Sequence, residues 1–329
     1  MDQYIPPYSI TDKMLELVSE IAEKIGKITN HSESASQVHL RRNNRIRSIH
    51  SSLKIEANSL SLSEVRDVVN GHLVIGNRKE IQEVKNAYAA YELISSINPF
   101  SIEDLEKLHG IMTYGLLDDT GEFRKGNEGV FSGDRCIFIA PPPERVYSLI
   151  SDLLQWMKQN QNRVHPLIMG AVFHYEFVFI HPFSDGNGRM ARLWHTVILS
   201  KWKKEFEYIP LESQIEKYQQ EYYKAIEQSH TNGNSNTFIE FILEMINQVL
   251  EEVINQPINH NNLSPYVKKL LNCMDYDVPY TAKEIMGKLS LKSRDTLRKN
   301  YINPAIKMGF IMMTIPDKPN SRNQRYVKI

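Results

Sequence analysis

Apolar side chains recur every three or four residues along most of the chain, a spacing that gathers them on one face of an α-helix. The first such run extends from Met14 to Ile25. Further helices are predicted by the same spacing over Leu40–Leu60, Ser63–Val69, Lys79–Ser96, a segment capped by Ser101, Glu144–Met157, Met190–Trp202, Leu211–Ser229 and Thr237–Ile254. The pattern therefore predicts a mainly α fold.

Two stretches depart from this pattern. Residues Pro166–Ile180 are apolar almost all the way round, broken mainly by His174 and Glu176, so this helix is expected at the centre of a core. Short apolar stretches on either side of residues 132–135 predict a β-hairpin over Val130–Ile139. The hairpin should end at the three prolines that follow, because proline cannot donate to a strand ladder.

Length and composition narrow the class of protein. The 329 residues leave room for about two domains, and 41% hydrophobic with 24% charged residues is typical of a globular protein. No apolar run approaches a membrane span, and no secretory signal pattern opens the sequence. The two cysteines, Cys136 and Cys273, lack the spacing of a zinc motif. We expect a cytoplasmic protein with no membrane partner.

The charges are unevenly distributed, although the whole chain balances 39 basic against 39 acidic side chains. Residues 262–329 hold 13 Lys or Arg and 5 Asp or Glu, so the last fifth of the chain is a basic unit. Three predicted helices followed by two short strands indicate a small winged helix-turn-helix domain at residues 265–329. Its basic residues suit the phosphates of DNA, and docking of another protein is the alternative.

One segment is expected to carry the chemistry, and it consists of His181-Pro182-Phe183-Ser184-Asp185-Gly186-Asn187-Gly188-Arg189-Met190-Ala191-Arg192. Gly186 and Gly188 open a helix, where small residues, free N–H groups and the helix dipole form a cradle for an anion. Arg189 and Arg192 lie three residues apart on one face of that helix, and their planar guanidinium groups suit phosphate oxygens.

Two side chains precede this cradle. Asp185 offers a hard oxygen ligand where a phosphate-bound Mg²⁺ would sit. His181 ends the buried helix, and an imidazole beside an anion site can take a proton from an attacking hydroxyl. A base, a metal ligand, an anion cradle and a cationic clamp together indicate phosphoryl or nucleotidyl transfer.

The segment resembles the signature of the Fic (filamentation induced by cAMP) family, HPFx[D/E]GNGRxxR, at every specified position. The resemblance implies a Fic-type helical core, ATP as donor, and transfer of AMP to a Ser, Thr or Tyr hydroxyl of a target protein. It implies His181 as the base, Asp185 as the ligand of a Mg²⁺ that bridges the α- and β-phosphates, and Arg192 at the γ-phosphate. The residues implied to bind the nucleotide are Gly186, Asn187, Gly188, Arg189 and Arg192.

The predicted hairpin is similar to the family's flap, which holds the target polypeptide as an added strand. The residues implied to contact the target are Val130, Phe131, Ile137, Phe138 and Ile139. The parts of the chain are then expected to be an N-terminal helical region at residues 1–50, a Fic core with inhibitory helix and flap at 51–205, helices packed on that core at 206–254, a linker at 255–264, and the winged-helix domain at 265–329.

A second family pattern, the inhibitory helix [S/T]xxxE[G/N], is matched in part by residues 52–58. Ser52 and Glu56 fit, whereas Ala57 stands where Gly or Asn is usual, and alanine is expected to favour helix there. The resemblance implies that Glu56 pairs with Arg192 and keeps the γ-phosphate from settling productively. A carboxylate on the helix surface with no such role is the alternative, since this spacing also occurs by chance.

The sequence thus predicts a Mg²⁺-dependent protein adenylyltransferase that is inhibited by its own Glu56. Two other activities use the same site: removal of AMP from a modified protein, or transfer of another phosphate-containing group. A DNA-binding regulator whose Fic site only senses nucleotide is the alternative outside enzymes, and the intact His181 argues against it. The expected partners are ATP, a target protein, a second copy of the chain in a homodimer, and DNA.

Overall fold

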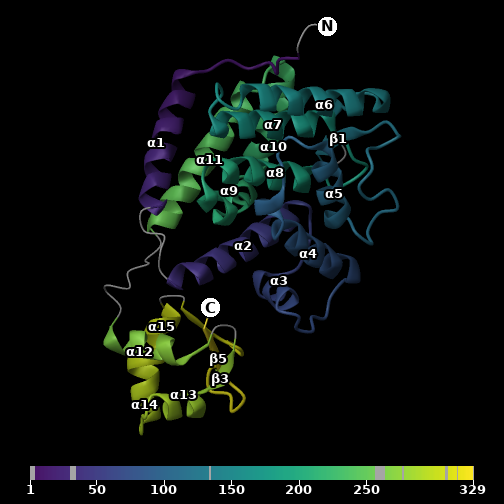
Figure 1. Ribbon diagram of the computed structural model, residues 1–329. Coiled ribbons are helices and arrows are strands. Elements are labelled where there is room, and N and C mark those ends of the chain that lie inside the picture. The colour runs from purple at the N-terminus through teal and green to yellow at the C-terminus, as the bar shows by residue number, and fades with distance from the viewer. Residues whose placement is uncertain are drawn as a thin grey trace. The chain divides into compact units, whose positions relative to one another are not determined.

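The fold was taken from a computed structural model, which describes residues 4–29, 35–132, 135–255, 264–275, 278–307, 310–316 and 318–328. The side chains of residues 35–40, 130–138 and 255 lie outside that description. The chain divides into two compact units, Met1–Ile254 and Asn255–Ile329 (Figure 1). Most described residues are helical, so the predicted mainly α fold class is confirmed.

The first unit is built from helices and one hairpin. In the described residues its helices are α1 (Asp12–Thr29), α2 (Ala35–Ile55), α3 (Leu62–Val69), α4 (Arg78–Tyr91), α5 (Ile102–Met112), α6 (Pro143–Asn160), α7 (Pro166–Ile180), α8 (Asn187–Trp202), α9 (Leu211–Lys217), α10 (Gln219–Asn232) and α11 (Asn236–Asn255), with 3₁₀ turns η1 (Ile94–Ser96) and η2 (Lys204–Tyr208). The hairpin consists of antiparallel strands β1 (Gly129–Ser132) and β2 (Arg135–Ile139). As predicted, Ser101 caps α5 by accepting a hydrogen bond from Asp104 N.

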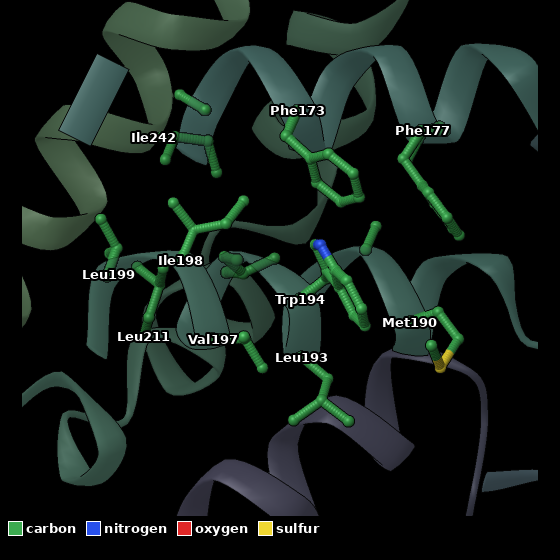
Figure 2. Packing of buried hydrophobic residues seen from close by; sticks show 14 of the residues in the cluster. Phe173, Phe177, Met190, Leu193, Trp194, Val197, Ile198, Leu199, Leu211 and Ile242 are labelled. Atoms are coloured by element: carbon green, nitrogen blue, oxygen red, sulfur yellow. The ribbon is translucent and has the colours of Figure 1, made fainter. Parts of the chain in front are cut away.

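Helix α7 runs through the centre of the first unit, and residues 167–178 are all buried. Its neighbour α8 is buried almost as fully, and side chains of the two helices interleave around Phe173, Phe177 and Trp194 (Figure 2). Each large apolar side chain removed from water stabilises the fold by about 1.5–3 kcal/mol. The two helices therefore form a rigid base for the loop that joins them.

Helix α1 lies alongside α11, although most of the chain separates them (Figure 1). The face of α1 predicted to be apolar is buried, and polar contacts flank it: Lys24 Nζ lies 2.8 Å from Glu251 Oε2, and Asn247 Nδ2 donates to Glu20 Oε2 at 2.6 Å. One continuous hydrophobic cluster joins residues from α1 through α11. The first unit consequently has a single core.

Two predicted boundaries differ from the structure. The helix expected over Leu211–Ser229 is two helices, α9 and α10, because the backbone leaves helical geometry at Tyr218, with φ −115° and ψ 39°. Apolar spacing does not reveal this break, since both helices bury a face against the same core. Helix α2 spans Ala35–Ile55, so it ends before Leu60, where the predicted helix ends.

The second unit has a hydrophobic core of its own, formed by residues such as Val267, Leu270, Ile285 and Leu297. Its described elements are α12 (Pro265–Cys273), β3 (Pro279–Thr281), α13 (Ala282–Lys288), a continuous helical segment composed of α14 (Arg294–Thr296), the π-helical turn η3 (Leu297–Ile302) and α15 (Asn303–Lys307), and then β4 (Ile311–Met313) and β5 (Arg325–Lys328). The sheet is antiparallel in the order β3-β5-β4. It therefore has three strands, where the sequence predicted two. Strand β3 is only three residues long and includes a proline, which hides it from periodicity.

The linker predicted at residues 255–264 lies mostly outside the described residues, between the end of α11 and the start of α12. Among the helices that the structure describes, none combines the length and the apolar character needed to cross a bilayer.

Candidate active site

The loop between α7 and α8 brings the predicted catalytic segment to one place. His181 ends α7 in the left-handed conformation, with φ 52°, and Gly186 precedes α8 with φ 82°. A side chain at Gly186 would be strained by that φ, and its Cβ would lie 3.3 Å from Thr113 Cγ2. The loop therefore turns sharply, and α8 begins without a side-chain cap on its first N–H groups. These N–H groups and the helix dipole favour an anion there.

The His181 imidazole is oriented from behind. Its Nδ1 lies 3.3 Å from the carbonyl oxygen of Val178, which places the proton on Nδ1 and leaves Nε2 as the acceptor. Burial lowers the pKa of His181 below its ordinary value, and the Arg124 guanidinium lowers it further, while the Val178 carbonyl and the carboxylates of Glu56 and Asp185 act in the opposite direction. A neutral imidazole with a free Nε2 is suited to accept a proton at neutral pH.

Asn187 shapes the loop through both ends of its amide group. Its Oδ1 accepts from Phe183 N at 2.9 Å, and its Nδ2 donates to Phe183 O at 2.7 Å. The Asn187 amide thereby fixes the loop, and the second N–H of its Nδ2 takes part in neither bond. The backbone N–H groups around Gly186 and Gly188 are further anion donors of this segment.

Asp185 lies just before α8, and Arg189 lies in the first turn of that helix. Asp185 Oδ1 accepts from Gly186 N at 2.5 Å and lies 3.3 Å from Arg189 Nη2. The side chain of Asp185 is about half exposed, whereas Arg189 is buried and also faces Glu83 Oε1 at 3.8 Å. Asp185 can thus offer an oxygen to a cation from solvent, and Arg189 remains close to the anion cradle.

Arg192 bonds to α2 and to the turn that follows it. Its Nε donates to Ser52 Oγ at 3.1 Å, and its Nη2 donates to Ser52 O at 2.9 Å and to Glu56 Oε1 at 2.7 Å. The Arg192 side chain is 1% exposed and that of Glu56 is 38% exposed. The structure therefore brings Ser52 and Glu56 together with the second arginine of the segment, across 136 residues of sequence in the case of Glu56.

The Glu56 carboxylate also covers the start of α8. A Cβ built on Gly188 would lie 2.5 Å from Glu56 Oε1, closer than carbon and oxygen can approach, so a larger residue there would displace the carboxylate. The Glu56 side chain thus lies against both the anion cradle at Gly188 and the cationic clamp, Arg192. A carboxylate at this place repels an incoming phosphate and competes with it for Arg192.

Residue Ala57 does not extend the helix, contrary to expectation. Helix α2 ends at Ile55, and Ala57 has φ 66° in a turn closed by Ala57 N to Lys54 O at 3.0 Å and Asn58 N to Leu53 O at 3.1 Å. These bonds form the left-handed C-terminal cap in which Gly or Asn is usual, and a Cβ costs about 1–2 kcal/mol there. Asn58 secures the turn, since its Nδ2 donates to Glu83 Oε2 at 2.8 Å.

Two residues that hold the loop in place were missed by sequence reasoning. Arg124 lies in the irregular tract before the hairpin, and its Nε donates to His181 O at 2.6 Å and its Nη1 to Gly126 O at 2.7 Å. Its Nη2 bonds to Pro141 O and also donates to Ile180 O at 3.3 Å. One buried guanidinium therefore ties the end of α7 to both ends of the hairpin.

His109, on α5, is the second missed residue. Its ring stacks on Phe183 with 3.7 Å between centroids, and its Nδ1 accepts from Gly121 N at 3.0 Å. Its Nε2 therefore carries the proton and donates to Asp185 O at 3.0 Å. Burial lowers the pKa of His109 to about 4, so this contact is made by a neutral ring. No local signal in the sequence distinguishes either residue from an ordinary Arg or His.

The hairpin lies at the edge of this site. Its strands pair Gly129 with Ile139 and Val130 with Phe138, with a shift in register after Val130. The side chains of Val130, Phe131, Ile137 and Phe138, all predicted to contact a target, lie outside the described residues. Ile139 is described and is 77% exposed, so it is accessible to a partner.

Known proteins match both units of the chain. The Fic/DOC family matches residues 99–199, and the family "Filamentation induced by cAMP protein Fic-like, C-terminal domain" matches residues 265–327. A protein adenylyltransferase Fic of Culex quinquefasciatus is 29% identical over 216 residues, which cover 63% of this chain and 41% of that protein. The protein adenylyltransferase fic-1 of Caenorhabditis elegans is 26% identical over 219 residues, covering 64% and 42%. The chain spans about two fifths of the length of these curated relatives.

Solved structures extend the comparison. A Fic family protein from Desulfovibrio desulfuricans G20 is 39% identical, with a TM-score of 0.75, and the match covers 99% of this chain and 98% of that chain. A structure of Fic-1 from C. elegans, at 22% identity and a TM-score of 0.60, covers 74% of this chain and shares its fold. The similarity to the Desulfovibrio protein includes the second unit as well as the first.

Proposed function

The chain belongs to the Fic family, and from this premise we propose that it is a protein adenylyltransferase that moves AMP from ATP to a Ser, Thr or Tyr hydroxyl of a target protein and is inhibited by Glu56. The observation that carries the proposal is the convergence of an oriented base, His181, with an uncapped helix start and a buried clamp, Arg192, in the α7–α8 loop and the first two turns of α8. The names of the curated relatives support the same reaction.

The residues present can divide the reaction among them. His181 Nε2 would take the proton as the target hydroxyl oxygen forms its bond to the α-phosphorus. The bond from that phosphorus to the bridging oxygen breaks, and pyrophosphate leaves. The N–H groups around Gly188, with Arg189, would hold the α- and β-phosphates, and Arg192 the γ-phosphate. Alignment and charge neutralisation then account for most of the acceleration.

Asp185 fits the proposed Mg²⁺. No group of three or more metal-ligating side chains occurs within the described ranges, which argues against a cage built by the protein alone. A half-exposed carboxylate beside an anion cradle matches the way Mg²⁺ usually binds with a nucleotide, through one or two carboxylates, phosphate oxygens and water. Asp185 would hold the ion there, and the ion would supply positive charge against the phosphates.

We expect label to pass to protein from ATP labelled at the α-phosphate, and none to pass from ATP labelled at the γ-phosphate. The measurement is labelling of the chain itself and of a cell extract, with Mg²⁺ and after its removal by a chelator. Chelation should stop the transfer, because it removes the positive charge that Asp185 would hold against the triphosphate. Transfer of γ-label would contradict the proposal and indicate the alternative in which a different phosphate-containing group is moved.

Removal of AMP from a modified protein is a second candidate for this site. It is favoured by one observation: the Glu56 carboxylate is 38% exposed and lies over the start of α8, where it could orient a water molecule. Binding of DNA by the basic second unit is a separate proposal, and it concerns a different surface. The homodimer and the cytoplasmic location stay predictions.

Arg124 is expected to act as a positioning residue in the proposed reaction. Replacing it by Lys leaves a single ammonium that cannot reach the carbonyls of His181, Gly126 and Pro141 together. We expect kcat to fall by at least about 10-fold and the KM for the target to rise, because a shift of about 1 Å at the base is costly. ATP affinity should stay close to wild type, because the Arg124 guanidinium bonds to the end of α7 and to the segments beside the hairpin, not to Gly188 or Arg192.

The variant Arg124→Gln separates this role from a purely structural one. The Arg124 charge helps to keep the pKa of His181 low, so its removal should raise that pKa and move the acidic limb of the rate profile to higher pH. Arg124→Lys keeps the charge and should leave the limb in place. Equal pH profiles for the two variants, or unchanged kcat in both, would contradict the assignment.

A further inference from the structure

The second unit contains a cleft that the proposed transfer reaction does not use. Its volume is about 540 Å³, and we name it the wing cleft. It is lined by three segments that are distant in sequence: residues 281–283 at the start of α13, residues 294–298 of the long helical segment, and residues 319–326 in and after the loop between β4 and β5. A cavity of this size can accept a small group or one strand of an extended ligand.

The lining of the wing cleft is strongly basic. Four cationic side chains line it, Lys283, Arg294, Arg298 and Arg322, against one carboxylate, Asp295. All four side chains are exposed, so they stay hydrated until a ligand binds. Lys283, Arg294 and Arg322 take part in no ion pair within the described residues. Like charges gathered around one concave surface favour a polyanion.

Arg298 has a different part from the other three cations. Its Nη2 donates to Asn320 Oδ1 at 2.6 Å and lies 3.4 Å from Pro319 O, so its side chain joins the helical segment to the β4–β5 loop. The shape of the cleft is thereby set before binding. Lys283, Arg294 and Arg322 are left to contact a ligand.

One amide side chain that lines the cleft is buried. Gln324 lines the cleft and is 6% exposed, and its Nε2 donates to Arg325 O at 2.6 Å. Its Oε1 is buried and has no hydrogen-bond partner in the part of the chain that the structure describes. Because this oxygen is inaccessible, the contacts that the cleft offers to a ligand are those of its exposed cations.

We propose that the wing cleft holds one strand of the backbone of duplex DNA, with Lys283, Arg294 and Arg322 contacting its phosphates. Guanidinium groups match phosphate oxygens in geometry as well as charge, and a helix start beside a loop can follow a backbone and enter its groove. The inference rests on the proposed DNA-binding role of the second unit and is independent of the transferase site.

The test measures binding of the full chain to a fluorescent duplex of mixed sequence, by anisotropy, over a range of salt concentrations. Each phosphate contact contributes roughly 0.9 to the slope of log affinity against log salt. The double variant Arg294→Ala/Arg322→Ala should therefore reduce that slope by about 1.8 and weaken binding at low salt. The matched control is Lys268→Ala/Lys269→Ala on α12, which removes the same charge from exposed residues outside the cleft.

The salt dependence of DNA binding by the two double variants decides between a specific cleft and a general basic surface. Loss of slope in the cleft variant and not in the control supports the wing cleft. An equal loss in both variants overturns the inference and leaves only a basic surface that attracts DNA. No binding by the unaltered chain overturns the DNA-binding proposal itself. Displacement of the duplex by poly-glutamate at equal charge concentration would identify an acidic protein as the partner class instead. Thermal melting checks the fold, and it should not change because both altered pairs are exposed.

Discussion

Replacing His181 by Ala should lower the rate of AMP transfer by about 10²–10⁴-fold, the usual contribution of a general base. The loop orients the imidazole with Nε2 as a free acceptor, since Nδ1–H donates to Val178 O. ATP affinity should change little, because the start of α8 and Arg192 do not depend on the ring. The measurement pairs single-turnover labelling with ATP binding by calorimetry, in the Glu56→Gly background so that there is activity to lose.

The control for this experiment is the pH dependence of the unaltered site. A base works only in its neutral form, and burial has lowered the pKa of His181. The rate should therefore hold as the pH falls toward the ordinary imidazole value of about 6.5 and decline only below it. Transfer by His181→Ala at a rate near the parent's would show that another group takes the proton. It would also remove the main support for the mechanism.

The loop itself could be predicted from the sequence because its chemistry is local. An anion cradle, a cationic clamp, a metal ligand and a base fall within twelve consecutive residues, and Gly186 marks where the backbone must bend. Helix α7 was predicted with both of its bounds, since Pro166 starts it and His181 ends it. These features depend on neighbours in sequence, for which spacing is a direct guide.

The support for the loop could not be predicted in the same way. Arg124 acts through carbonyl oxygens at Gly126, Pro141 and Ile180, and nothing in its own neighbourhood indicates that these will meet. His109 reaches Asp185 O only because α5 packs beside the loop. The turn at Ala57 was misjudged for a related reason: helix propensity favours alanine inside a helix, but the packing of Asn58 against Glu83 ends the helix first.

Replacing Glu56 by Gly should raise AMP transfer, the opposite of what removing a residue from an active site usually does. The carboxylate bonds to Arg192 at 2.7 Å and covers Gly188, so it occupies the clamp and the cradle together. A charge-assisted hydrogen bond contributes about 1.5–3 kcal/mol, which corresponds to an increase of roughly 10- to 150-fold once it is removed. Autolabelling at saturating ATP measures the change.

Two matched variants identify the cause of that increase. Glu56→Gln keeps the shape of the side chain and removes its charge, so it should give an intermediate rate if repulsion and clamp occupancy both contribute. Arg192→Ala should be poorly active with or without Glu56, because the γ-phosphate then has no clamp. If Arg192→Ala in the Glu56→Gly background were as active as Glu56→Gly alone, the clamp would not act on the γ-phosphate.

The position of Glu56 also determines how inhibition could be relieved. The side chain extends from a turn just beyond the end of α2, and it is 38% exposed, so it can leave Arg192 by rotating about its own bonds while α2 stays packed. Ser52, inside the helix, would keep two of its hydrogen bonds to Arg192 and hold the clamp in place for the γ-phosphate. Glu56→Gly should therefore gain activity without losing thermal stability. An unchanged or lower rate would contradict inhibition by Glu56. If the wild type converts AMP-modified target back to unmodified target and Glu56→Gly does not, Glu56 would instead be assigned to AMP removal.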